Sequence, residues 1–280
     1  MPARSGPSPT DTKGAIRDFA RAGGGALIFS LPMLMTMELW WLGFYLDRLR
    51  LLVLLLTCLP LLVLLSRHVG FERTRGWRDD VFDALIALGV SIPVCVVLLT
   101  LFGTITFDTP VDEIVGKVVI QTVPAAIGAL LAKSQFGAEP SDGEDVGEED
   151  EPYGGELFLM GVGALFLGFN VAPTEEMMLI SYRMTEWHAL LLVALSLALM
   201  HGFVFAVGFA GGSEVSREDP WWSAFVRMTL PGYVIALSIS LYLLWIFART
   251  DGLPMEDVVT AMIVLGFPAA IGAAAARLIL

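Results

Sequence analysis

Runs of about 20 consecutive apolar residues recur along the whole chain, and no other feature restricts its fold as strongly. An apolar helix of that length matches the hydrocarbon thickness of a bilayer, so each run predicts a membrane-spanning helix. Strands of a transmembrane barrel would instead alternate in hydrophobicity over about ten residues. We therefore expect an all-α, polytopic helical membrane protein. Its eight transmembrane helices are expected at residues 22–43, 49–66, 81–103, 112–132, 156–180, 188–209, 225–248 and 256–279.

The composition agrees with this class of protein. Only 16% of the residues are charged and 56% are hydrophobic, whereas soluble domains carry about 25% charged residues. The mean hydropathy is +0.72. These values exclude a soluble enzyme, a nucleic-acid-binding protein, a secreted disulfide scaffold and a disordered chain. The lipid bilayer is the expected partner. Cys58 and Cys95 lie within apolar runs and are expected to be buried thiols.

Much of the formal net charge of −12 comes from one acidic segment that contains no lysine or arginine, residues 138–156. A run of like charges repels itself and stays solvated, which predicts a flexible linker; a metal-attracting or partner-binding role is the alternative. The expected organisation is a polar N-terminal tail, a first four-helix repeat, the linker and a second four-helix repeat. These cover residues 1–21, 22–137, 138–153 and 154–280.

The basic residues are unevenly divided between the two sides that eight spans define. Twelve fall on the side of both termini: Arg4, Lys13, Arg17, Arg21, Arg67, Arg73, Arg75, Arg78, Lys133, Arg217, Arg227 and Arg277. Five fall on the other side: Arg48, Arg50, Lys117, Arg183 and Arg249. Because cytoplasmic loops carry an excess of lysine and arginine, we expect a cell-membrane protein with both termini and the linker in the cytoplasm.

The chain also repeats itself. Residues 110–133 align without gaps onto 254–277, and the aligned pairs include the hexapeptide PAAIGA in both copies. A weaker match pairs Gly25-Ala26-Leu27 and Thr36-x-Glu38 with Gly163-Ala164-Leu165 and Thr174-x-Glu176. Two halves with an even number of spans enter the membrane in the same orientation, so this pattern predicts two parallel repeats about an axis along the membrane normal. The small residues of PAAIGA favour close helix packing.

Three stretches resemble an uncharacterised family of prokaryotic multi-pass integral membrane proteins, known as a domain of unknown function. They are LPMLMTMELWWLG at 31–43, GALFLGFNVAPTEE at 163–176 and GFPAAIGAAAARL at 266–278. The resemblance covers nearly the whole chain apart from the linker and the N-terminal tail. It implies the multi-pass fold and carries no known activity or functional residues.

Glu38 is the strongest candidate for chemistry. A charged side chain inside a span costs about 2.5–3.5 kcal/mol on insertion scales and is a functional candidate for that reason. Glu38 is expected roughly 8 Å inside the outer end of the first span, at 1.5 Å per residue, with Glu176 and its neighbour Glu175 at a similar depth in the fifth. Pro32 and Pro173 precede these glutamates and are expected to kink their helices. Glu38 and Glu176 facing one another would form a proton- or cation-binding pair; the alternative is hydrogen-bonded glutamates near the outer interface.

The other ionisable groups are weaker candidates. Asp112, Glu113, Glu256 and Asp257 follow prolines at helix starts, where acids complement the helix dipole, and an outer acidic vestibule is the alternative. Asp83 and Arg227 occupy matching positions and either pair between the repeats or extend separately to the interface. The histidines His68, His188 and His201 have no second ligand at metal spacing. No motif for a catalytic nucleophile occurs either.

These features predict a transport protein or channel for protons or small cations, with Glu38, Glu176 and Glu175 as the binding groups. A scaffold or assembly protein is the alternative, and a membrane-embedded enzyme acting on lipid is a third class. No cofactor is expected. The transported ion, any metal and a homo-oligomeric state are left open by the sequence.

Overall fold

The computed structural model describes residues 9–69, 76–136, 153–207 and 221–279, and all regular structure within these ranges is helical. The chain divides into two compact units, residues 1–144 and 145–280. The expected N-terminal tail is partly helical, since the first helix already begins at Pro9. Nearly all of the acidic linker lies outside the described residues.

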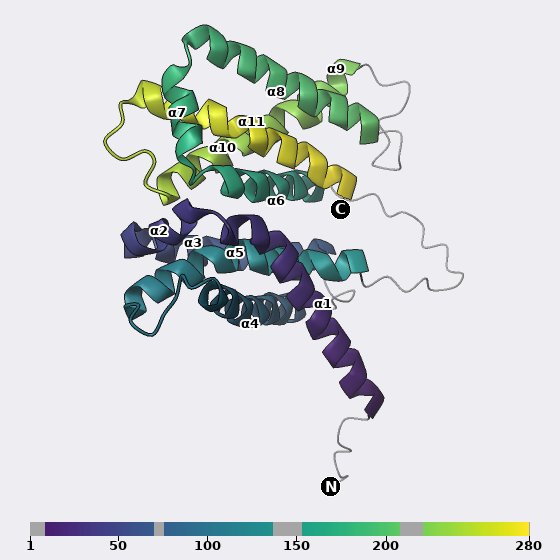
Figure 1. Ribbon diagram of the computed structural model, residues 1–280. Coiled ribbons are helices and arrows are strands. Elements are labelled where there is room, and N and C mark those ends of the chain that lie inside the picture. Colours follow the sequence, from purple (N-terminus) through teal and green to yellow (C-terminus); the bar gives the residue numbers. More distant parts are fainter. Residues whose placement is uncertain (1–8, 70–75, 137–152, 208–220, 280) are drawn as a thin grey trace, which may run out of the picture. The chain divides into compact units, whose positions relative to one another are not determined.

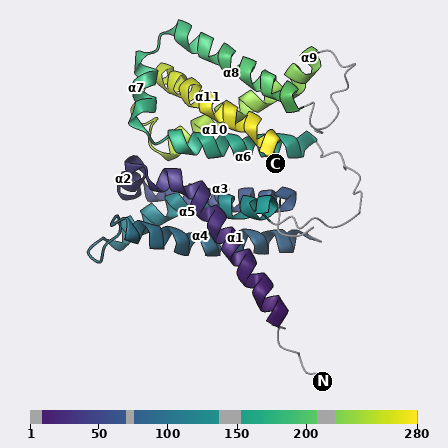
Figure 2. The same ribbon diagram turned by 45° about the vertical axis from the view of Figure 1, so that its right-hand side comes forward.

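Unit 1 is built around one central helix. Its elements are α1 (Pro9–Leu34), α2 (Met37–Tyr45), α3 (Arg48–Val69), α4 (Trp77–Leu101) and α5 (Val111–Phe136). The other four helices all pack on α5, and Figure 1 shows α5 lying among them. As a result every residue of α5 from Ile120 to Ala132 is buried. The N-terminal turns of α1 extend beyond the other helices of the unit (Figures 1 and 2).

Unit 2 is arranged around α11. Its elements are α6 (Tyr153–Val171), α7 (Glu175–Arg183), α8 (Glu186–Val207), α9 (Trp221–Ala224), a π-helical turn η1 (Phe225–Thr229), α10 (Leu230–Ile246) and α11 (Met255–Ile279). Helices α6, α7, α8 and α10 all contact α11, as Figure 2 illustrates. The wide turn η1 lies just before Pro231, whose ring would clash with the carbonyl four residues earlier in a regular α-helix.

Seven of the described helices are long and apolar enough to cross a membrane, or up to eight spans if the bent pair α1–α2 counts as one. The expected helical membrane class is therefore confirmed. Two expected spans are not continuous helices. The first bends by 85° between α1 and α2, and the fifth ends at Val171, after which the short helix α7 begins at Glu175.

The outer helices present apolar side chains to their surroundings. On α3 and α8 the exposed residues include Leu49, Leu52, Leu56, Leu190, Leu191 and Leu195. Rows of exposed leucine are unfavourable in water, whereas lipid tails solvate them as well as a protein core does. These faces are the surfaces expected of helices that lie against lipid.

Each unit contains a very close helix crossing at its PAAIGA segment. In unit 1, a methyl group placed on Gly25 of α1 would collide with the carbonyl oxygen of Gly128 and the Cβ of Ala132, both on α5. In unit 2, a methyl group placed on Gly163 of α6 would collide with Gly272 and Ala276 of α11. Only glycine permits this approach, as in other membrane helix pairs with small residues at the contact. The two PAAIGA segments therefore serve close packing, as the sequence predicted.

Candidate functional site

The break between α1 and α2 exposes backbone carbonyls that other groups must satisfy. The Pro32 carbonyl accepts the Thr36 hydroxyl at 2.7 Å, and the Leu34 carbonyl accepts the indole N–H of Trp40, also at 2.7 Å. The Met33 carbonyl accepts the Nε2 amide of Gln121 from α5 at 3.2 Å. Because unpaired carbonyls are costly away from water, these three bonds stabilise the break.

The second break, between α6 and α7, is satisfied differently. The Thr174 hydroxyl donates to the Val171 carbonyl at 2.8 Å. The guanidinium of Arg249, from the segment after α10, donates to the Pro173 carbonyl. A cationic side chain therefore lies at this break.

The three candidate glutamates lie just beyond these breaks. Glu38 is in the first turn of α2, and Glu175 and Glu176 are in the first turn of α7. Each of these helices has nine residues and a threonine at its N-cap, and the helix dipole there favours a carboxylate. Glu38 is half-buried, whereas Glu175 and Glu176 are exposed. Over the described residues, none of the three carboxylates has a hydrogen-bond or ion-pair partner.

The sequence predicted Glu38 and Glu176 inside the first and fifth spans, each after a proline kink. They instead follow helix breaks in separate units. The prolines expected to kink the helices lie at the breaks, since Pro32 is in the last turn of α1 and Pro173 is between α6 and α7. That the two glutamates form a pair stays a prediction.

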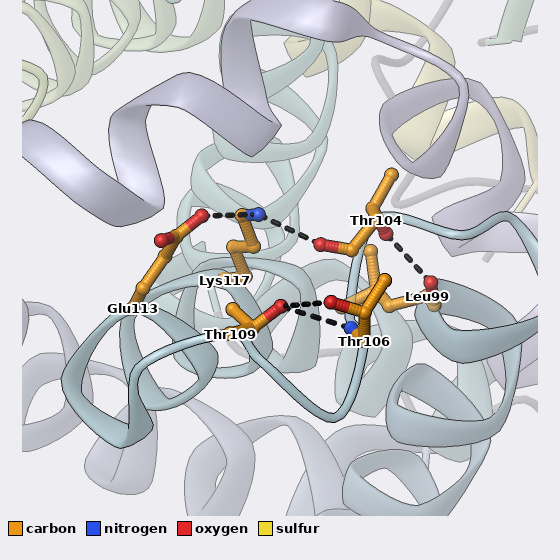
Figure 3. Close-up of polar contacts among 6 residues, drawn as sticks. All are labelled: Leu99, Thr104, Thr106, Thr109, Glu113 and Lys117. Carbon is orange, nitrogen blue, oxygen red and sulfur yellow. Dashed lines mark hydrogen bonds and ion pairs between the residues drawn. The ribbon is translucent and has the colours of Figure 1, made fainter.

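A buried ion pair in unit 1 was not predicted. The ammonium Nζ of Lys117 lies 2.6 Å from Oε1 of Glu113, one turn earlier on α5. It also donates to the backbone carbonyl of Thr104 at 2.8 Å. Figure 3 shows the two side chains pointing toward one another, with Thr104 on the far side of the ammonium. Lys117 is only 8% exposed, so the two charges interact where solvent screens them little.

The end of α4 positions the Thr104 carbonyl. The Thr104 N–H bonds the Leu99 carbonyl at 2.9 Å and the Gly103 N–H bonds the Thr100 carbonyl at 3.0 Å, which is a Schellman motif. Gly103 has the positive φ, 71°, that this motif requires. The Thr104 hydroxyl adds a second bond to the Leu99 carbonyl at 2.7 Å. These bonds fix Thr104 directly after a helix C-terminus, where the helix dipole favours a cation.

The stem of Lys117 is enclosed by protein. Gly43 of α2 lies so close that an added methyl group would meet the Lys117 backbone and side chain. The next residue on α5, Val118, belongs to an apolar cluster with Leu34, Leu99 and Ile105, and Trp40 packs against this cluster. The ammonium itself is held by the oxygen atoms of Glu113 and Thr104.

Gln121 continues the same face of α5 one turn further. Residues 113, 117 and 121 are spaced by four, which places them along one side of the helix. Gln121 is 1% exposed, and over the described residues its Oε1 has no hydrogen-bond partner. A buried amide oxygen without a donor is costly and marks a position where a water or another donor would be favourable.

The remaining candidates occupy ordinary surroundings. Asp112 pairs with Arg48 at 3.2 Å in an exposed position, and Glu256 and Asp257 lie in the first turn of α11. These placements fit the predicted helix-start role; the outer vestibule stays a prediction.

Asp83 accepts the Ser66 hydroxyl at 3.2 Å within unit 1. Arg227 lies in η1, where its carbonyl accepts the Tyr153 hydroxyl at 2.6 Å. The proposed ion pair between Asp83 and Arg227 stays a prediction.

The histidines make local contacts. His68 bonds the Leu64 carbonyl at 2.8 Å, His188 bonds the Thr185 hydroxyl at 2.8 Å, and His201 bonds the Thr229 hydroxyl at 3.0 Å. Among the described residues, no group of three or more His, Cys, Asp or Glu side chains is placed to hold a metal ion.

The apolar helices and their lipid-type surfaces define a multi-pass integral membrane protein. Residues 18–280 match the model of the family described as "Putative integral membrane protein (DUF2391)", and the chain belongs to that family. The predicted resemblance to a domain of unknown function is thus confirmed. No curated protein and no solved structure matches the chain.

Proposed function

We propose that the protein transports protons or small cations across the membrane. The observation that supports this most is the pair of helix breaks, each followed by a short helix that begins with Thr-x-Glu. Discontinuous helices in transporters bring ion-binding groups and unwound carbonyls into the membrane. A packing protein has no need of an unpaired carboxylate beside each break.

The proposal includes two structural repeats, one for each unit. Helices α2 and α7 both have nine residues, and α3 and α8 both have 22. The close crossings Gly25–Gly128 and Gly163–Gly272 join corresponding positions, at offsets of 138 and 144 residues. These correspondences support a common four-helix unit that places Glu38 and Glu176 at equivalent positions, near a pseudo-twofold axis as the sequence suggested.

The test is ion flux into liposomes that contain the purified protein. A pH gradient and gradients of single cations are applied in turn, and entry is followed with dyes specific for each ion. We expect flux for the wild type and a loss of about tenfold or more for Glu38→Gln and Glu176→Gln, because the amide keeps the shape but cannot titrate or carry charge.

Glu186→Gln is the matched control, since Glu186 is also exposed in the first turn of a unit 2 helix, α8, but follows no break of a span. Its flux should equal that of the wild type. Wild-type liposomes without flux for any ion tested would favour the scaffold alternative. Full flux in the double variant Glu38→Gln/Glu176→Gln would mean that the protein transports ions without the help of these two glutamates.

A further inference from the structure

We infer that the ammonium of Lys117 occupies a cation-binding site of unit 1, formed by the Glu113 carboxylate and the Thr104 carbonyl. The two oxygen atoms lie 2.6 and 2.8 Å from Nζ. Carboxylate and backbone carbonyl oxygens are also the groups that bind small inorganic cations in membrane proteins. One carboxylate and one carbonyl suit a small cation of single charge, and the chain supplies that cation itself as the Lys117 ammonium.

The surroundings of Nζ favour a positive charge from two directions. Glu113 contributes a carboxylate whose side chain is 20% exposed. The Thr104 carbonyl follows the C-terminus of α4, where the helix dipole adds negative potential. The stem of Lys117 is held against Gly43 of α2, which keeps the ammonium beside these two oxygen atoms.

The corresponding face of α11 differs. At the offset of 144 residues, Glu113 corresponds to Asp257, whereas Lys117 and Gln121 correspond to Ala261 and Leu265. The acid is kept in both units, but the internal ammonium is present in α5 only. A lysine added to one copy of a helix is consistent with a fixed charge that replaces a mobile cation.

The experiment removes the ammonium and asks whether a free cation replaces it. Lys117→Met keeps the apolar stem and leaves the carboxylate without its partner. The melting temperature is measured in detergent at about pH 8, where a carboxyl group is ionised. Lithium, sodium and potassium chloride are compared with N-methylglucamine chloride, which is too large for the site, at constant ionic strength.

We expect a saturable rise of about 3 °C or more for Lys117→Met with at least one of the small cations. The wild type should show no such cation-specific rise. Arg48→Met is the matched control. It removes the exposed partner of Asp112, the neighbour of Glu113 on α5, and it should show no such rise. The double variant Lys117→Met/Glu113→Gln should lose the rise.

Four results would overturn the inference. The first three are a folded Lys117→Met protein whose melting temperature is the same in all four salts, an equal rise in the wild type, and a rise that persists in the double variant. If Lys117→Met and Lys117→Ala yield no folded protein in any of the small-cation buffers, the vacated site does not accept a cation and the inference is also wrong. The readout does not depend on flux, so it is independent of the proposed transport activity.

Discussion

Gly24 and Gly25 are neighbours on α1 with opposite surroundings, which makes them a test of the helix crossing. A methyl group on Gly25 would collide with α5, whereas one on Gly24 meets nothing within 4 Å. We expect Gly25→Ala to destabilise the protein by about 1–3 kcal/mol, because the backbones must move apart. Gly24→Ala should be neutral or slightly stabilising, because alanine favours the helix. Melting temperatures in detergent measure both.

Unit 2 offers the same comparison in an independent place. Gly163 contacts Gly272 directly, whereas a methyl group on Gly161 would meet only ordinary side-chain neighbours at 3.6 and 3.8 Å. Gly163→Ala should therefore be more destabilising than Gly161→Ala. Equal melting temperatures for all four alanine variants would show that the crossings are looser than described.

At the scale of whole elements, the ends of α4 and α10 lead to a further prediction. Both helices end in a Schellman motif, but α10 has Ala248 at the position of positive φ, 59°, where α4 has Gly103. A residue with a Cβ atom is disfavoured there by about 1 kcal/mol. We expect Ala248→Gly to raise the melting temperature and Gly103→Ala to lower it. A lower melting temperature for Ala248→Gly would contradict this explanation.

Helix positions were largely predictable from the sequence, whereas the breaks were not fully so. Long apolar runs gave the spans of α3, α4, α5, α8, α10 and α11 to within a few residues, since hydropathy reports length directly. Hydropathy does not report direction, so the 85° turn after Leu34 could not be read from it. Pro32, Pro173 and the N-cap threonines Thr36 and Thr174 were the available signals, and they predict a kink more readily than a complete break.

The candidate site was predicted only in part. Glu113 was identified as an acid at a helix start, which it is. Its partner Lys117 was visible at a spacing of four residues, but the surroundings of Lys117 depend on Gly43 of α2 and on Thr104 after α4. Contacts between segments so far apart in the sequence cannot be derived from helical periodicity alone.

At the scale of the whole molecule, the orientation in the membrane gives the last prediction. The twelve-to-five division of basic residues predicts that the linker lies in the cytoplasm. A protease site inserted near residue 145 should be cut in inside-out membrane vesicles and stay intact in right-side-out vesicles. Cleavage in right-side-out vesicles alone would reverse the orientation. Because residues 144 and 145 mark the boundary of the two units, cleavage there should leave each unit's fold intact.

The contact between Gly43 and α5 has a mechanical consequence. A methyl group on Gly116 would collide with the Gly43 carbonyl, as one on Gly25 would with Gly128, so α1, α2 and α5 touch backbone to backbone. Surfaces in such contact cannot slide or rotate without collision, so these three helices move as one rigid body. In the second unit, Ser181 and Thr260 take the places of Gly43 and Gly116 at the same offsets. Residues with a Cβ atom cannot reproduce the contact of two glycines, so we expect α7 to move more freely against α11 than α2 does against α5.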